Sequence, residues 1–475
     1  MAEKFDVIVI GGGTAGLVTA SGCSRLGRRT ALISREPLGG DCLWTGCVPT
    51  KSLVATASLI QKMKSAEYYG LDPHHPVIDP QRIMKSMRTA RARIEPHDDP
   101  EKFRDLGIDV IFEHAELLSA GRVRAGSRTF DAKNIVIATG ARTFVPPVKG
   151  LEETGYMDHR SFLEQDQLPG RIVVMGGGAI GIEFAQIFRR FGSEVTVVEL
   201  FDEILLREDQ DVISRVRSIL EKEGITIRTG WKVTQASRIS DGKLVTIESG
   251  SGEIERIEVD EIFVSAGRRG NHENMGLEQV GVKVKKNHVV VDEYLGTTAD
   301  GVWAVGDIKG PPQFTHVAAY EAVKLVRNML FPGRSKISYD HIPWGVYTDP
   351  EVAHIGLTQK EAEEAHGADG IRIYAVEMAD LDRAVTERTS QGFLKVILDR
   401  KGRILGAHAV CTHATTLIQE IVVARQNGLK ITSLTSSVSS YPSLADAVRK
   451  IGTLYYQDLG QSWLGSIARR VASWS

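Results

Sequence analysis

Two cysteines separated by four residues, Cys42 and Cys47, are the side chains of this sequence best suited to redox chemistry. Such a pair alone is compatible with metal ligation, a structural bridge or a redox-active dithiol. Its context is informative, because a strand-like run at 5–10 leads into a GxGxxG loop at 11–16 shortly before the cysteines. Loops of this kind bind dinucleotides, since their glycines allow backbone amides to approach a pyrophosphate at the start of a helix. The order of these signals predicts a redox-active dithiol beside a flavin rather than two buried free cysteines near an unrelated turn.

A second glycine-rich loop repeats this arrangement about 165 residues farther along the chain. A strand-like run at 171–175 is followed by GxGxxG at 176–181 and by a helical run at 184–188. One such loop alone could be a tight strand-to-helix turn without a ligand. Two loops that each open a βαβ unit predict two dinucleotide sites.

Length and composition narrow the possible classes of protein. A chain of 475 residues is too long for one hydrophobic core and should form three or four lobes. The formal net charge is -2 and charged residues form no long blocks, so nucleic-acid binding is not expected. No apolar run is long enough to span a bilayer, and the first residues lead directly into a strand, which leaves no room for a secretory signal. Because four cysteines are typical of a reducing compartment, we expect a cytoplasmic protein.

Strand-like segments beyond the loops indicate how the lobes follow one another. Buried-type runs lie at 134–141, 261–268 and 301–307. The last run ends in Gly306 and Asp307, and this aspartate can accept a hydrogen bond from a ribityl hydroxyl or cap the following helix. From about residue 338, a strand-like run at 393–398 and a helical run at 415–427 suggest an α+β lobe.

We therefore expect an α/β fold with two Rossmann-type dinucleotide-binding domains and a C-terminal α+β domain. The expected boundaries are 1–150 for the FAD-binding domain, 151–270 for the NAD(P)-binding domain, 271–337 for a return segment to the FAD domain, and 338–475 for the C-terminal domain.

The ordered set of motifs resembles the flavoprotein disulfide reductase family, which contains glutathione reductase, dihydrolipoamide dehydrogenase and mercuric reductase. The resemblance covers nearly the whole chain. It rests on GxGxxG at 11–16, Gly-Gly-x-Cys-x4-Cys-Val-Pro-[Ser/Thr]-Lys at 39–51, Ala-Thr-Gly at 138–140, the second GxGxxG with Glu183, and Ala-Val-Gly-Asp at 304–307. It implies FAD in the outer lobes, a nicotinamide nucleotide in the inserted lobe, and a homodimer in which the C-terminal dimerisation lobe completes the partner's active site.

The resemblance also implies roles for the catalytic candidates. Cys42 would be the interchange thiol that faces the substrate, and Cys47 the thiolate packed against the flavin. Lys51 and Glu183 would form an ion pair near the reactive nitrogen of the flavin. The chemistry agrees with these roles, because the thiolate is the competent species and a nearby lysine lowers the pKa of a thiol.

The candidate cofactor-binding residues lie on the two glycine-rich loops, at neighbouring strand ends, or beside the dithiol. For FAD they are Gly11, Gly13, Thr14, Ala15, Gly16, Ser34, Glu36, Gly40, Asp41, Lys51, Thr139, Gly140, Gly306 and Asp307. For the nicotinamide nucleotide they are Gly176, Gly178, Ala179, Ile180, Glu199 and Gly267. The sequence indicates no resident metal site.

Three of these candidates bear on how the nucleotides are held. Ser34 stands at a strand end where dinucleotide sites usually carry a carboxylate, so its bond to a ribose hydroxyl would be weaker, with Glu36 near enough to assist. Ala179 stands where related reductases often have a tyrosine lid, which predicts a more open nicotinamide pocket. Glu199 ends the strand after the second loop and would repel a 2′-phosphate, so we expect NAD rather than NADP.

The most consequential departure from the family pattern lies at Tyr441. Family members that handle dithiols have a His-Pro-[Ser/Thr]-x-x-Glu motif, whereas this chain has tyrosine at 441 and aspartate, Asp446, at the last position. A phenol with a pKa of about 10 is a poor general base beside an imidazole of about 6.5. Mercuric reductase also has tyrosine there, but this chain ends without that enzyme's vicinal cysteines.

These observations predict an FAD-dependent NAD(P)H oxidoreductase with a redox-active disulfide. It would pass two electrons through the Cys42–Cys47 disulfide to a small thiophilic, disulfide or quinone-type acceptor. The alternatives are a dihydrolipoamide dehydrogenase with an altered acid/base and an electron-delivery or redox-sensing subunit that acts on a protein partner. An amphipathic pattern at 463–474 suggests docking on the protein's own surface, with a protein partner or a membrane surface as the lesser alternatives.

Overall fold

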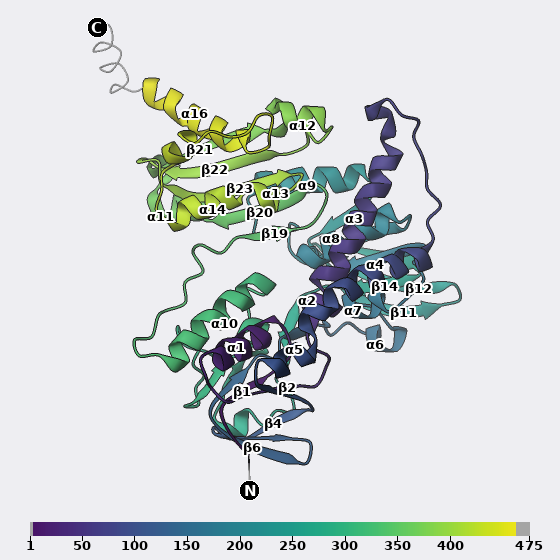
Figure 1. Cartoon of the computed structure of the whole chain (residues 1–475). Helices are drawn as coiled ribbons and strands as arrows, with labels where there is room; N and C mark the ends of the chain where they lie inside the picture. Colours follow the sequence, from purple (N-terminus) through teal and green to yellow (C-terminus); the bar gives the residue numbers. More distant parts are fainter. Residues whose placement is uncertain (1–2, 462–475) are drawn as a thin grey trace, which may run out of the picture.

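The computed structural model describes residues 3–461 and contains three sheets that position the candidate site, with helices packed around them (Figure 1). None of the helices in this range is long and apolar enough to cross a membrane. The amphipathic pattern at 463–474 lies outside the described residues.

The first sheet has seven strands, in the order β3-β2-β1-β6-β5-β4, with β18 added beside β6. Its parallel centre is almost wholly apolar and buried, as expected for a sheet covered on both faces. Two helices, α1 (Thr14–Arg25) and α10 (Thr315–Leu330), pack against each other beside it (Figure 1). The strands are β1 (Glu3–Ile10), β2 (Thr30–Ser34), β3 (Ile108–Phe112), β4 (Ala115–Ser119), β5 (Arg122–Ala125), β6 (Arg128–Ile137) and β18 (Val302–Ala304).

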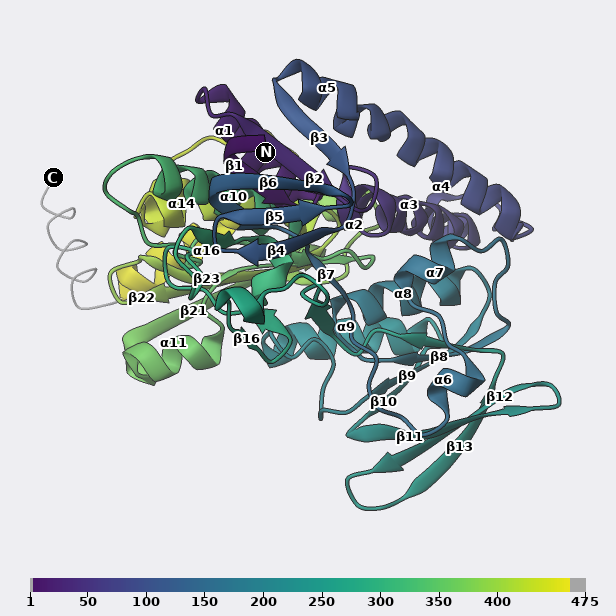
Figure 2. The same ribbon diagram turned by 90° about the horizontal axis from the view of Figure 1, so that it is seen from below.

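Helices that carry or support the cysteines leave this sheet and pack on the second unit. The cysteines lie on α2 (Gly40–Trp44) and at the start of α3 (Cys47–Lys64). Helix α3 packs against α4 (Pro80–Ile94) and α8 (Ala179–Arg190), and Figure 2 shows α3 and α4 beside the second unit. A short helix, α5 (Pro100–Asp105), then leads back to the first sheet.

The second unit is built on a four-stranded parallel sheet in the order β10-β9-β8-β14. Phenylalanines from α7, α8 and β14 fill its core with edge-on and tilted ring contacts. A three-stranded antiparallel sheet projects from this unit (Figure 2). The elements are α6 (Leu151–Thr154), α7 (His159–Leu163), β8 (Arg171–Met175), β9 (Glu194–Glu199), α9 (Gln210–Lys222), β10 (Thr226–Thr229), β11 (Trp231–Ile239), β12 (Gly242–Ser249), β13 (Ile254–Val259) and β14 (Glu261–Val264).

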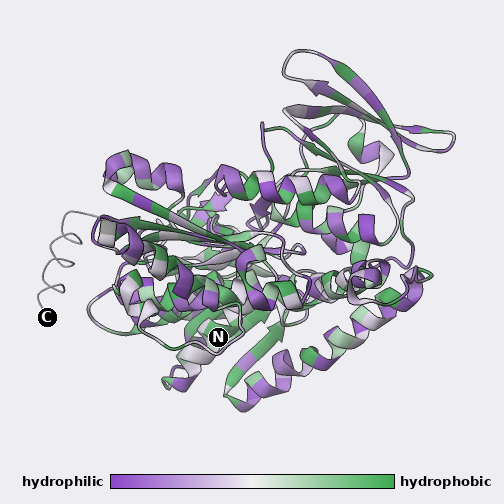
Figure 3. Ribbon diagram, turned by 90° about the horizontal axis from the view of Figure 1, so that it is seen from above, coloured by the Kyte–Doolittle hydropathy of each residue, from purple (hydrophilic) through white to green (hydrophobic). Residues whose placement is uncertain are grey.

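The C-terminal unit is a five-stranded antiparallel sheet in the order β19-β20-β23-β22-β21. Figure 3 shows hydrophobic and hydrophilic residues alternating along the helices of the structure, as expected where one side of a helix is buried. The elements are β19 (Trp344–Val346), β20 (Glu351–Gly356), α11 (Gln359–His366), β21 (Ile371–Glu377), α12 (Asp382–Thr386), β22 (Phe393–Asp399), β23 (Ile404–Cys411), α13 (Ala414–Leu417), α14 (Gln419–Gln426), α15 (Ile431–Thr435) and α16 (Asp446–Gln461).

Short elements connect the units. Strand β7 pairs antiparallel with β15, so the outgoing and returning connections run side by side. These elements are β7 (Ala141–Thr143), β15 (Arg268–Gly270), β16 (Val284–Lys285), β17 (His288–Val289) and the 3-10 helix η4 (Gly306–Lys309). The remaining 3-10 turns are η1 (Ala66–Tyr69), η2 (Glu95–Asp98), η3 (Glu278–Val280), η5 (Ala368–Gly370) and η6 (Met378–Asp380).

The expected fold class is confirmed, while several element boundaries were wrong. The strand expected at 134–141 ends at Ile137, and the helix expected at 415–427 is divided into α13 and α14. Asp307 does not cap the long helix that follows, because it lies inside η4 and α10 begins after Phe314. The return of β18 to the first sheet agrees with a segment that rejoins the first unit, although the expected domain boundaries themselves remain predictions.

Candidate functional site

One cavity of about 860 Å³ joins the first glycine-rich loop to the cysteines and to the start of α8. All the residues expected to hold FAD line it except Gly16, which lies behind the loop. On the nucleotide side, Ala179 and Ile180 reach this cavity, whereas Gly176, Gly178, Glu199 and Gly267 do not. The dithiol therefore lies where the two expected cofactor sites meet.

Close packing of the first loop explains why its glycines are required. A Cβ on Gly11 would lie 2.2 Å from the carbonyl oxygen of Ala138, and one on Gly16 would lie 1.8 Å from that of Gly11. Gly13, in contrast, has open space toward the cavity, with only the Cα of Gly40 within 4 Å of such a Cβ. The backbone here is therefore both tightly folded and accessible, which fits the pyrophosphate of FAD.

Arg268 and two carboxylates line the same cavity as this loop. Nη2 of Arg268 contacts Oδ2 of Asp41 at 2.6 Å and Oδ2 of Asp307 at 3.2 Å. Burial raises the pKa of Asp41, but Arg268 and Arg160 outweigh it and lower that pKa to about 2. Burial raises the pKa of Asp307. Arg268 thus pairs with both carboxylates in a partly buried environment.

Ser34 and Glu36 both line the cavity, but the serine hydroxyl is already engaged. It donates to the carbonyl oxygen of Glu36 at 2.7 Å. Its oxygen can still accept a hydrogen bond, whereas the Glu36 carboxylate lies near Arg35 and Arg160, at 3.3 and 3.7 Å. The expected contact from this strand end to a ribose thus remains a prediction.

Cys42 and Cys47 are not joined by a disulfide in this structure, and Cys47 occupies the more polar position. Its sulfur lies 3.2 Å from Oγ1 of Thr315, and Cys47 and Thr315 are the first residues of α3 and α10. Two long helices therefore begin beside this sulfur, and helix N-termini favour negative charge. The hydrogen bond between the sulfurs raises the pKa of Cys42 and lowers that of Cys47, which Thr315 and Lys51 lower further. This arrangement favours a protonated Cys42 and a Cys47 thiolate.

A lysine–glutamate pair closes the cavity beside Cys47. Nζ of Lys51 lies 2.8 Å from Oε2 of Glu183. Oε1 of Glu183 accepts a hydrogen bond from the backbone N–H of Tyr347 at 2.8 Å. The same ammonium lies 4.3 Å from the centre of the Tyr347 ring. Burial opposes the charge of Lys51, but Glu183 outweighs it and raises the pKa of the lysine. The structure thus brings together the lysine and glutamate that the sequence analysis paired.

Glu199 organises the second loop. Its Oε2 accepts a hydrogen bond from the backbone N–H of Gly177 at 2.6 Å, and its Oε1 accepts one from the backbone N–H of Phe201 at 2.9 Å. Gly178 has open space around it, as a loop that admits a ligand requires, and Gly267 has a φ of 125°, in the region that favours glycine. A carboxylate held at this strand end is suited to ribose hydroxyls and disfavours a 2′-phosphate.

Tyr441 and Asp446 lie in the C-terminal unit and do not line the cavity of their own chain. Tyr441 is 74% exposed, and its hydroxyl donates to Asp382. Asp446 accepts a hydrogen bond from Nε of Arg449 at 2.6 Å. The aspartate is thus engaged by an arginine on its own helix.

Sequence reasoning missed three residues that complete the site: Arg268, Thr315 and Tyr347. Arg268 follows Gly267 at the end of an expected strand, a position that could have marked it as facing a ligand. Thr315 and Tyr347 carry no comparable signal, because they reach Cys47 and Lys51 only through the return of distant segments.

Comparison with known proteins identifies the class to which this site belongs. Residues 5–322 match the pyridine nucleotide-disulphide oxidoreductase family, and residues 342–451 match the dimerisation domain of that family. The chain therefore belongs to the pyridine nucleotide-disulphide oxidoreductases, whose members use FAD and NAD(P). The expected family, cofactors and enzyme class are confirmed.

Relatives within the family differ in the acceptor that their names indicate. The chain is 35% identical to a dihydrolipoyl dehydrogenase of Rhizobium etli over 95% of this chain and 98% of that protein. It is 28% identical to a mercuric reductase of Bacillus cereus over 96% and 72% of the two chains. A solved structure, the Cu(II) complex of the HOCl-induced flavoprotein disulfide reductase RclA from Escherichia coli, matches with a TM-score of 0.85 and 29% identity over 95% and 99% of the chains.

Proposed function

We propose that this protein is an NADH-dependent flavoprotein reductase that delivers electrons from its Cys42–Cys47 pair to a thiophilic metal ion. The observation that carries the proposal is the chemistry at 441. A phenol stands there in place of the imidazole that serves dithiol exchange in the family. The RclA complex with Cu(II) supports a metal acceptor, and the mercuric reductase relatives support the same chemical class.

When bound, FAD supplies the two-electron step between the nicotinamide and the sulfurs. On the protein side, the Cys42–Cys47 disulfide takes up two electrons, its S–S bond breaks, and one proton is taken up by Cys42. The Cys47 thiolate is held by Thr315, Lys51 and two helix N-termini. Two Cu(II) ions then accept one electron each, which gives two Cu(I) ions, restores the disulfide and releases the proton.

Reduction of a metal ion depends less on an imidazole base than reduction of an organic disulfide does. Lipoamide reduction requires a proton at the leaving sulfur, and general acid–base catalysis contributes roughly 10² to 10⁴-fold to such steps. A metal ion that binds a thiolate needs no proton from the protein. A phenol or phenolate oxygen can instead serve as an additional ligand, supplied by the partner's C-terminal unit if the active site is shared as the family resemblance implies.

The proposal is tested by anaerobic NADH oxidation with Cu(II), Hg(II) or lipoamide as the acceptor, each corrected for the enzyme-free rate. We expect turnover with the metal ions, and loss of it in Cys42→Ser while NADH still reduces the flavin. Cys411→Ala, which removes a buried thiol outside the cavity, should retain the rate. Metal reduction that persists in Cys42→Ser, or lipoamide turnover that exceeds metal turnover, would overturn the proposal.

Dihydrolipoamide dehydrogenase is the second candidate, because the 35% identical Rhizobium etli relative carries that name. Efficient lipoamide turnover in the same assay would favour it. Rapid flavin reduction without turnover until a protein partner is added would instead favour an electron-delivery subunit.

The proposed assembly is a homodimer formed through the C-terminal unit, in accord with the match of residues 342–451 to the dimerisation domain. We also propose the cytoplasm as its compartment, since four cysteines in 475 residues are typical of a reducing environment. Sedimentation of the holoenzyme tests the dimer directly.

A further inference from the structure

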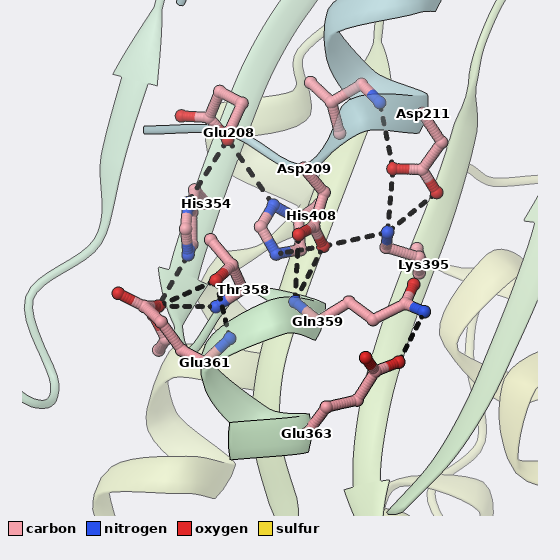
Figure 4. A network of polar contacts seen from close by, with 12 residues as sticks. Glu208, Asp209, Asp211, His354, Thr358, Gln359, Glu361, Glu363, Lys395 and His408 are labelled. Atoms are coloured by element: carbon pink, nitrogen blue, oxygen red, sulfur yellow. Dashed lines mark hydrogen bonds and ion pairs between the residues drawn. The ribbon is translucent and has the colours of Figure 1, made fainter. Parts of the chain in front are cut away.

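Three side chains able to ligate a metal meet at the junction of the second unit and the C-terminal sheet, outside the cavity described above. Nδ1 of His354 lies 3.2 Å from Oε2 of Glu208, and Nδ1 of His408 lies 3.4 Å from the same oxygen. Their ligand atoms lie within 4.8 Å of one another. Figure 4 shows Glu208 facing both imidazoles.

Local structure explains why these groups converge. Glu208 lies just before α9 of the second unit, whereas His354 and His408 are direct partners on the adjacent strands β20 and β23. Both histidines are fully buried, and Glu208 is 8% exposed. Trp344 covers His354, with ring centres 3.9 Å apart, and donates its indole N–H to Oε1 of Glu208 at 2.7 Å.

The hydrogen-bonding capacity of the two rings does not match their surroundings. Nε2 of His354 lies 3.0 Å from the carbonyl oxygen of Gly356. Nε2 of His408 lies 3.2 Å from Oδ2 of Asp209 and makes no aligned hydrogen bond with a described residue. Both Nδ1 atoms face Glu208. Three ring nitrogens thus hydrogen-bond to oxygen acceptors, whereas two neutral imidazoles carry only two N–H groups.

Either protonation of the rings or a bound cation can account for this mismatch. Protonation of one ring would supply the third N–H but bury a cation in a fully buried site, and protonation of both would bury two cations whose ring centres are 4.0 Å apart. A single divalent cation between the Nδ1 atoms and Glu208 resolves the mismatch with neutral rings. The Nε2 hydrogens then point to Gly356 and Asp209, and such outer partners are characteristic of histidines that bind metals. Asp209 is itself held by Lys395 at 2.8 Å.

We propose that Glu208, His354 and His408 bind one divalent transition-metal ion, with Zn²⁺ as the best match. Two imidazoles and one carboxylate suit zinc rather than magnesium or calcium. Tetrahedral ligands with bonds of about 2.0 to 2.1 Å lie about 3.3 to 3.4 Å apart, close to the observed 3.2 and 3.4 Å. A water molecule would complete the coordination. The ion would cross-link the second unit to the C-terminal sheet, and this inference does not depend on the proposed acceptor.

The test measures zinc in tag-free holoenzyme kept in its oxidised form, so that the Cys42–Cys47 disulfide cannot ligate the ion. After chelation and re-addition of Zn²⁺, we expect about one zinc per chain by mass spectrometry. Glu208→Gln and His354→Phe should lose this zinc. Trp344→Phe, which keeps an aromatic ring beside His354 but removes the N–H donor to Glu208, should bind it about 10- to 100-fold more weakly. His366→Phe, at the exposed end of α11, is the matched control and should bind normally.

A measurement on the wild-type chain keeps the proposal testable if the variants do not fold. Co²⁺ added to the metal-free oxidised holoenzyme should give visible ligand-field bands of a tetrahedral nitrogen and oxygen site, without the charge-transfer band of a thiolate ligand. Failure to bind stoichiometric Zn²⁺ or Co²⁺ would overturn the proposal and favour a protonated imidazole beside Glu208. Equal zinc in Glu208→Gln and His366→Phe would overturn it as well. Neither readout depends on turnover, so the result is separate from that of the proposed function.

Discussion

Replacement of Thr315 by valine removes one hydroxyl from the environment of Cys47 and leaves the shape of the site nearly unchanged. The Thr315 hydroxyl lies 3.2 Å from the Cys47 sulfur and is one of the groups that lower the pKa of this thiol. Valine has the same branched shape at Cβ but no hydroxyl. We therefore expect the pKa of Cys47 to rise in Thr315→Val.

The size of the change follows from the charge of the acceptor. A hydrogen bond to an ionised group contributes about 1.5 to 3 kcal/mol, and one pKa unit corresponds to about 1.36 kcal/mol. The pKa of Cys47 should thus rise by about 1 to 2 units. As the pH falls, the Cys47 thiolate becomes protonated near the pKa of Cys47. The variant, with its higher pKa, therefore loses the thiolate at a higher pH than the wild type does.

The assay follows the long-wavelength charge-transfer absorbance between the Cys47 thiolate and oxidised flavin in two-electron-reduced enzyme. Its pH midpoint should shift upward in Thr315→Val and stay near that of the wild type in Thr315→Ser, which keeps the hydroxyl. Cys47→Ser should have no band at any pH. A midpoint that is equal in the valine and wild-type proteins, or equally shifted in the valine and serine variants, would refute the assigned role of Thr315.

Three further predictions concern other parts of the site. Lys51→Met leaves the Glu183 carboxylate, which is 7% exposed, without its cation. Because the lysine is partly exposed and a backbone N–H still bonds to Glu183, we expect the free energy of unfolding to fall by about 1 to 3 kcal/mol. The double variant with Glu183→Gln should recover most of this loss. Tyr441→His with Asp446→Glu should raise lipoamide turnover in steady-state assays, and no gain would show that another group limits dithiol exchange. NADH should have a higher kcat/KM than NADPH, and Glu199→Ala should narrow the difference; a wild-type preference for NADPH would contradict the role assigned to this carboxylate.

The parts of the fold that could be predicted are those encoded by local patterns. Each glycine-rich loop combines a short apolar strand, fixed glycine spacing and a helix, and close backbone contacts such as that between Gly11 and Ala138 enforce this combination. The Lys51–Glu183 pair was predictable only through the family pattern, because 132 residues separate the two side chains. The pairing of two motifs therefore required knowledge of a fold that joins them.

Contacts made by returning segments could not be predicted in the same way. Thr315 lies 268 residues from Cys47, in a helix start without a distinctive motif. His354 and His408 lie 54 residues apart in strands that look ordinary in sequence, and only their cross-strand pairing brings the two rings together. Long-range register determines such contacts, and register depends on the packing of the whole sheet.

The second unit contributes one glutamate to each of its neighbours. Glu183 reaches Lys51 beside the dithiol, and Glu208 reaches the histidine pair of the C-terminal sheet. Both carboxylates are buried, so a rotation of this unit would leave uncompensated charge on two sides at once. These contacts therefore favour the observed orientation of the unit expected to hold the nicotinamide. A rigid orientation suits a reductase in which electrons must pass in line from nucleotide to dithiol, because a displacement of about 1 Å can cost roughly 10²-fold in rate.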